Sequence, residues 1–179
     1  RRPPRSTLFP YPTLFRSYNM QIMTETSSKS FNINDTDIDR QIMMRRKARY
    51  NCAAATLCGT LAATGIPVDD DTLKHLSAGF AGGIGKTHNC GTCGAITGGV
   101  FALGLLSEGD DAKTARLAAE LFNHFKEKLG DVECNKLKSH ANLTPCDLCC
   151  LVTGRKIYEM MEREGLVKHP HSCHNHSAE

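Results

Sequence analysis

The chain contains no tryptophan, and aromatic residues make up only 6% of its 179 residues. Side chains on which nucleic-acid bases could stack are therefore scarce. Charge is nearly balanced, with 22 Lys and Arg against 19 Asp and Glu, which argues against a dedicated nucleic-acid-binding protein. No run approaches the roughly 18 consecutive apolar residues of a membrane span. We therefore expect neither nucleic acid nor a membrane as a partner.

Alternating apolar runs rich in β-branched residues, which are typical of strands, are also missing. Apolar residues instead recur at helical spacing between glycine-rich breaks. The sequence predicts an all-α fold, a bundle of four to five helices with a glycine-rich loop before a buried central helix. We expect helices over residues 37–64, 92–106, 110–129 and 144–164, and a short one capped by Asp70 or Asp71.

Particular residues support these boundaries. Gly130 follows the amphipathic segment 110–129 and is a typical helix end. Thr144 is predicted as the N-cap of the last helix, with Pro145 as its first helical residue. The central segment, CGAITGGVFALGLL at residues 93–106, is apolar on every face, which predicts that it is buried.

Residues 1–17, RRPPRSTLFPYPTLFRS, resemble the in-frame translation of a sequencing-adapter oligonucleotide with one residue changed. A disordered arm or a targeting peptide is the alternative. This segment holds four Arg and no acidic residue, so the rest of the chain has 18 basic and 19 acidic residues, a net charge of −1. Because of its resemblance to an adapter, we expect residues 1–17 not to belong to the folded domain. Residues 20–36 lack the apolar core of a secretion signal, from which we expect a cytoplasmic protein.

Nine cysteines are the outstanding feature of the chain. In a reducing compartment they indicate metal or redox chemistry rather than a disulfide framework. Cys90 and Cys93 form a C-x-x-C at the start of the central helix, and Cys146, Cys149 and Cys150 share a face at the start of the last helix. Because a helix N-terminus favours thiolate over thiol, we expect both groups to be activated.

The remaining cysteines are dispersed. Cys52 lies within an Ala-rich helical segment, Cys134 in the loop after residue 129, and Cys173 in the tail. Cys58 lies on an apolar stripe and is interpreted as a small core residue.

Several blocks then resemble the C-GCAxxG-C-C family of prokaryotic redox-active proteins, which is related to the N-terminal part of split-Soret cytochromes. The blocks are Asn51–Ala55, Phe80–Gly85, Cys93–Gly98, Ala102–Leu105, Cys134 and the pair Cys149-Cys150. The resemblance implies a helical protein in which four dispersed cysteines hold an iron–sulfur cluster. Carried over to this chain, the four are Cys52, Cys93, Cys134 and Cys149, with Cys150 as a substitute for Cys149. Cys90, Cys146 and Cys173 have no clear place in the family pattern.

The residues themselves leave three functions open. The first is electron transfer or redox sensing through an iron–sulfur cluster, with an unidentified electron donor or acceptor protein as partner. The second is metal-free thiol–disulfide exchange at Cys90 and Cys93. The third is a structural zinc module, although 52 residues separate the two C-x-x-C units, unlike a compact zinc ribbon. No substrate site for further catalysis is recognisable. The sequence leaves open whether the chain forms a homodimer.

These inferences divide the chain into four parts: an artefactual, disordered segment 1–19, a flexible N-terminus 20–36, a helical Cys-rich redox domain 37–166, and a disordered His/Cys tail 167–179. Two other patterns are set aside. Gly79 to Thr87 does not have the glycine spacing of a phosphate-binding loop, and we expect it instead to let the chain turn tightly into the central helix. The basic turn Arg45–Arg49 is interpreted as a solvated helix face.

Overall fold

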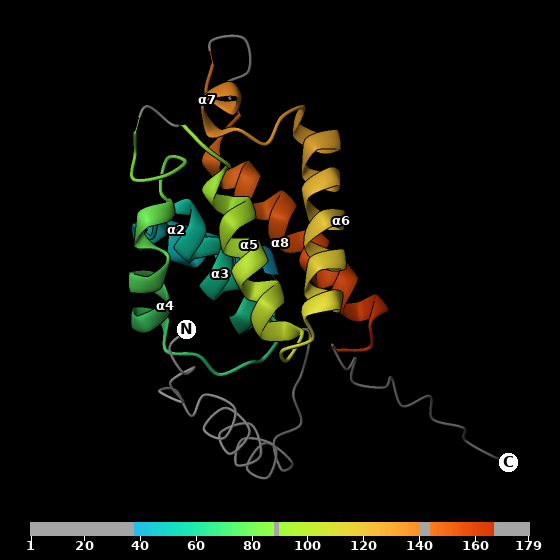
Figure 1. The fold of residues 1–179 in the computed structure, drawn as a ribbon. Helices are drawn as coiled ribbons and strands as arrows, with labels where there is room; N and C mark the ends of the chain where they lie inside the picture. Colours follow the sequence, from blue (N-terminus) through green and yellow to red (C-terminus); the bar gives the residue numbers. More distant parts are fainter. Residues whose placement is uncertain (1–37, 88–89, 140–143, 167–179) are drawn as a thin grey trace, which may run out of the picture. The chain divides into compact units, whose positions relative to one another are not determined.

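A computed structural model describes residues 38–87, 90–139 and 144–166, all of which lie in one compact unit. Segments 1–19 and 20–36, the tail 167–179 and with it Cys173 lie outside the described residues, so the predictions for them stay predictions. The elements are, in chain order, α2 (Ile38–Lys47), α3 (Cys52–Ala63), α4 (Asp70–Leu76), the 3-10 turn η3 (Ala78–Phe80), α5 (Gly94–Leu106), α6 (Asp111–Leu129), α7 (Cys134–Leu137) and α8 (Cys146–Arg163) (Figure 1). The predicted all-α fold is confirmed.

Helix α3 lies at the centre of the bundle and packs against α2, α4, α5 and α8, while α6 covers α5 and α8 (Figure 1). Its residues are buried almost throughout, as its Ala-rich sequence allows. The core has two parts. Leucines and methionines of α3, α5, α6 and α8 fill one end, and the cysteines, with Ile42, Ile96, Phe125 and Leu137, fill the other.

The prediction of a single helix over residues 37–64 is wrong. Helix α2 ends at Lys47, and Arg49 adopts a left-handed backbone conformation with φ of 67°. Asn51 then caps α3, because its side-chain oxygen accepts a hydrogen bond from the Ala54 N–H at 2.8 Å. An Asn at this position satisfies one of the free N–H groups of a new helix, so the chain turns between two helices here.

The starts of two other helices differ from prediction. Asp69, rather than Asp70 or Asp71, caps α4, because its carboxylate accepts from the Asp71 N–H. Thr144 does not cap α8; its N–H donates to the Leu137 carbonyl at 2.9 Å and so fastens the chain to α7. Pro145 occupies the N-cap position and α8 begins at Cys146. For α6 the predicted boundaries hold, since Asp110 caps its start.

The basic turn is a solvated face only in part. Arg45 is only 8% exposed, and its guanidinium forms two hydrogen bonds with the Asp70 carboxylate at 2.8 and 3.1 Å. Arg46 pairs with Asp147 at 2.7 Å. Both arginines therefore join α2 to neighbouring helices, while Lys47 and Arg49 are exposed as expected. Among the described residues, no helix has the length and apolar character to cross a membrane.

Candidate functional site: a buried cysteine cluster

Five buried cysteines gather at one end of the bundle, and each stands at or near the start of a helix. Cys52 is the first residue of α3, Cys93 caps α5, Cys134 is the first residue of α7, and Cys149 and Cys150 lie in the first turns of α8. Their exposed fractions run from 0% to 8%. The starts of α5 and α8 and the short α7 lie together at the upper end of Figure 1. We call these five residues the cysteine cluster.

A pair of backbone hydrogen bonds brings Cys93 and Cys134 together. The Cys93 N–H donates to the Val132 carbonyl at 2.8 Å, and the Cys134 N–H donates to the Gly91 carbonyl at 2.9 Å. Asp131 shapes the turn before Cys134 by accepting from the N–H groups of the next two residues. The start of α5 and the start of α7 are thus paired across a short antiparallel bridge.

Close packing at Gly94 brings Cys52 to the same place. A Cβ atom added to Gly94 would lie 2.5 Å from the Cys52 sulfur and even closer to the Phe80 carbonyl oxygen. Phe80 ends η3, just before the glycine loop, which we define as residues 81–87 and 90–91. Positive φ values at Gly82, Gly83, Gly85 and Gly91 let this loop fold tightly against the start of α5.

Cys149 and Cys150 have different partners. The Cys149 thiol lies beside the Cys93 thiol and is the largest single influence on its pKa. The Cys150 thiol instead donates to the backbone carbonyl of Cys52 at a sulfur–oxygen distance of 3.6 Å. Of the two neighbouring thiols of α8, Cys149 is therefore the one directed at Cys93.

The environment of four members of the cluster, Cys52, Cys93, Cys134 and Cys150, favours protonated thiols. The neighbouring Cys149 thiol, together with burial, raises the pKa of the Cys93 thiol. Burial and the neighbouring Cys93 raise the pKa of Cys52. Burial also raises the pKa of Cys134 to about 11 and that of Cys150 to about 12. For Cys93 and Cys150 the prediction of activated thiolates is wrong, because the neighbouring Cys149 thiol and burial at Cys93, and burial at Cys150, outweigh the helix dipole.

Several nearby groups act in the opposite direction. Backbone N–H groups of Gly82 and Ala53 are directed at the Cys52 sulfur, and those of Ala95 and Ile96 at the Cys93 sulfur; each lowers the pKa of the thiol that it contacts. The Arg46 guanidinium lowers the pKa of Cys150. A thiolate formed at Cys52 or Cys93, for example on metal binding, would therefore find donors already in place.

The donor set of the cluster suits thiophilic metals by its chemistry, since thiolates bind both zinc and iron–sulfur clusters. Within the described residues, however, no three His, Cys, Asp or Glu side chains are already placed to hold a metal ion. The cysteines fit such a group by type and by location, and binding would require their sulfurs to converge further.

The other predicted cysteines are not members of the cluster, although Cys146 is near enough to raise the pKa of Cys52 and of Cys134. Cys90 is exposed on the glycine loop, and Cys146 is half-buried at the start of α8. Cys58 is fully buried in α3, with its sulfur 3.9 Å from the Asp70 carbonyl; burial and Asp70 raise its pKa to about 11. Its interpretation as a core residue is confirmed. Predictions from the sequence missed two features, the close packing of Gly94 against Cys52 and the ion pair of Arg46 with Asp147 of α8. No local sequence pattern predicts either contact.

Comparison with known proteins gives one match. Neither the curated proteins nor the solved structures include a match to this chain. The family model described as "Putative redox-active protein (C_GCAxxG_C_C)" matches residues 50–173, which include every member of the cysteine cluster. The match spans more than half of the chain and agrees with the resemblance found in the sequence. The chain belongs to the C_GCAxxG_C_C family of redox-active proteins.

Proposed function

We propose that this redox-active protein holds an iron–sulfur cluster through Cys52, Cys93, Cys134 and Cys149 and uses it for electron transfer or redox sensing. One observation supports the proposal above all. Four separate elements deliver buried thiols to the same end of the bundle, one each from α3, α5 and α7 and two from α8. Cofactor sites of helical bundles are built in this way, from side chains on facing helices.

The surroundings of the thiols support the same function. Four cysteine thiolates are the usual ligands of [2Fe–2S] and [4Fe–4S] clusters, whose potentials depend on burial and on hydrogen bonds to sulfur. Here the thiols are almost inaccessible to water, and the backbone N–H groups of Gly82 and Ala53 are directed at the Cys52 sulfur. These residues would exclude water from the bound group and stabilise its thiolate ligands.

A second candidate is metal-free dithiol chemistry, which the proximity of the buried Cys93 and Cys149 thiols favours. Oxidation would join these two sulfurs in a disulfide and release two protons, with two electrons passing to an acceptor such as another disulfide. This pair differs from the predicted Cys90–Cys93 dithiol, in which one thiol is exposed and the other buried. The predicted pair and the zinc module both stay predictions.

Anaerobic purification of the full chain, followed by assay of iron, acid-labile sulfide and zinc and by visible absorption, tests the proposal. We expect stoichiometric iron and sulfide, with charge-transfer absorption that bleaches on reduction. Colourless, zinc-loaded protein would instead indicate a structural module, and metal-free protein with an oxidisable thiol pair would indicate dithiol exchange.

Two single variants separate the candidates. Cys134→Ser removes one of the four proposed ligands but neither member of the Cys93–Cys149 pair, so it should abolish the iron absorption and leave disulfide formation intact. Cys90→Ser alters an exposed thiol outside the cluster and serves as the matched control. Iron retained at wild-type level in Cys134→Ser would contradict the proposed ligand set.

A further inference from the structure

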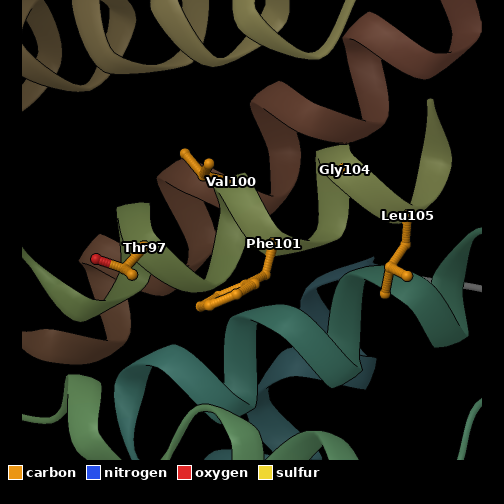
Figure 2. A pocket seen from close by; sticks show the side chains of 5 residues that line it. All are labelled: Thr97, Val100, Phe101, Gly104 and Leu105. Atoms are coloured by element: carbon orange, nitrogen blue, oxygen red, sulfur yellow. The ribbon is translucent and has the colours of Figure 1, made fainter. Parts of the chain in front are cut away.

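One face of the central helix α5 is open, although its sequence is apolar on every side. Thr97, Val100, Gly104 and Leu105 are only partly buried, and Phe101 is 42% exposed, so the prediction of a fully buried helix is wrong on this face. These five residues line a hollow of about 390 Å³ and carry no charge (Figure 2). The one hydroxyl among them, that of Thr97, donates to the Cys93 carbonyl of its own helix. A helix without a polar face ordinarily has all of its sides covered.

The open face combines a projection with a notch. Figure 2 shows the side chains of Phe101 and Leu105 projecting to one side of α5, whereas Gly104 lies on the other side, where Val100 projects. The Phe101 ring is held in place by edge-to-face contact with the Phe80 ring, at a centroid distance of 5.5 Å. At Gly104, an added Cβ atom would meet nothing within 4 Å. A face that bears both features can fit itself, because a two-fold axis places the projection of each copy against the notch of the other.

Charges at the two ends of α5 select the direction of such a pairing. The glycine loop before the helix exposes Lys86, and the turn after the helix exposes Glu108, Asp110 and Asp111. If two α5 helices packed in parallel, charges of like sign would meet at both ends. In an antiparallel pair, the lysine of each copy faces the acidic turn of the other. Complementary charges at the rim of an interface fix its register and speed association.

We propose that this face of α5 binds the same face of a second copy of the chain, with the two α5 helices antiparallel about a two-fold axis. The dimer would cover Phe101 and Leu105 on both copies and fill both hollows. This proposal does not rest on the iron–sulfur proposal, because the open face contains no cysteine and self-association can be measured without metal.

Sedimentation velocity of the full chain over a range of protein concentrations tests the proposal. We expect a reversible monomer–dimer equilibrium whose dissociation constant rises with salt. Gly104→Lys fills the notch and should raise the dissociation constant by about 100-fold or more. Its side chain would point into open space in the monomer, so the melting temperature should not fall. Ala119→Lys adds the same charge at an exposed position of α6 and should leave dimerisation unchanged.

A charge exchange tests the antiparallel direction. Lys86→Glu and Glu108→Lys should each weaken the dimer by about 10-fold at low salt, and the double variant should recover most of that loss. A chain that stays monomeric up to about 1 mM protein would overturn the proposal, because a dissociation constant above about 1 mM means a negligible interaction. The proposal would also be overturned if Gly104→Lys left the dimer unchanged. Binding of only a different protein or a small apolar molecule to this face would overturn it as well. A double variant without recovery would overturn the antiparallel arrangement.

Discussion

The sulfur of Cys52 lies 2.5 Å from the position that a Cβ atom of Gly94 would occupy. The first residue of α3 and the first residue of α5 thus approach more closely than any side chain at position 94 allows. The Phe80 carbonyl approaches the same point, and being backbone it cannot rotate away. The meeting of Cys52, the glycine loop and Cys93 therefore depends on a residue without a side chain at position 94.

Gly94→Ala should separate Cys52 from the start of α5. The added methyl group forces α3 or the glycine loop outward, and overpacking of this kind costs about 1–3 kcal/mol of the free energy of unfolding. Cys52, which is now 8% exposed, should become more accessible. We expect faster alkylation of Cys52 in the native protein, measured by mass spectrometry of its peptide, together with loss of bound iron.

Gly99→Ala is the matched control for this change. Its added methyl group would meet side chains of Thr153, Ile157 and Leu121 in the packing of α5 against α6 and α8, away from Cys52. It should lower the free energy of unfolding without changing the alkylation rate of Cys52. Equal alkylation rates in the two variants would show that Gly94 is important only for general packing.

Asp70→Ala should destabilise the protein, because it leaves Arg45 without its carboxylate partner. The Arg45 side chain is 10% exposed, and removing one member of a largely buried pair leaves an uncompensated charge. We expect a loss of about 2–3 kcal/mol in the free energy of unfolding, measured by urea denaturation. The exposed neighbour Asp71 offers the control, since Asp71→Ala should change stability by less than about 0.5 kcal/mol. Similar losses in both variants would contradict this role for the Arg45–Asp70 pair.

The stability of the α6–α8 contact should depend on acid pH through Glu120. Hydrogen bonds from Arg163 and then Lys156 lower the pKa of Glu120 from its ordinary 4.5 to about 2. A carboxylate with a lowered pKa stabilises the folded state above pH 4.5, and this contribution is lost as the pH falls through 2. Solvent screens these groups, so we expect Glu120→Gln to cost less than about 1 kcal/mol at pH 7.

Urea denaturation of wild type and Glu120→Gln between pH 2 and pH 7 measures this dependence. The difference between the two proteins should shrink steadily below pH 4.5. Glu127→Gln changes an exposed carboxylate of the same helix and should show little difference at any of these pH values. A Glu120→Gln difference that is constant with pH would indicate lost packing rather than lost charge.

Much of the fold follows from local sequence signals. The segment 110–129 carries its own cap at Asp110 and its own end at Gly130, which adopts φ of 86°, so its boundaries were predictable. The break between α2 and α3 was not, because helix-favouring residues continue on both sides and a single Asn side chain decides it. The open face of α5 could not be predicted either, since an apolar sequence does not reveal which of its faces the rest of the chain covers.

The candidate site was predictable by resemblance rather than by spacing. The sequence identified Cys52, Cys93, Cys134 and Cys149 through the family blocks, but their approach depends on contacts between distant segments, such as the bridge between Thr92 and Glu133. The ionisation of Cys93 and Cys150 was predicted wrongly. A helix start favours a thiolate where water remains, whereas Cys150 is fully buried, and its pKa rises to about 12.

The choice between Cys149 and Cys150 as ligand gives the sharpest prediction for the site. The Cys149 thiol is in contact with Cys93, whereas the Cys150 thiol is occupied by the Cys52 carbonyl. Cys149→Ser should therefore abolish iron binding in the anaerobically purified protein. In Cys150→Ser the hydroxyl can still donate to that carbonyl, so iron content should stay near the wild-type level, with a loss of about 1 kcal/mol in the free energy of unfolding. The reverse pattern of iron content would make Cys150 the ligand and would require α8 to rotate on binding. Equal loss in both variants would mean that the Cys150 bond to Cys52 is itself needed to hold the first ligand in place.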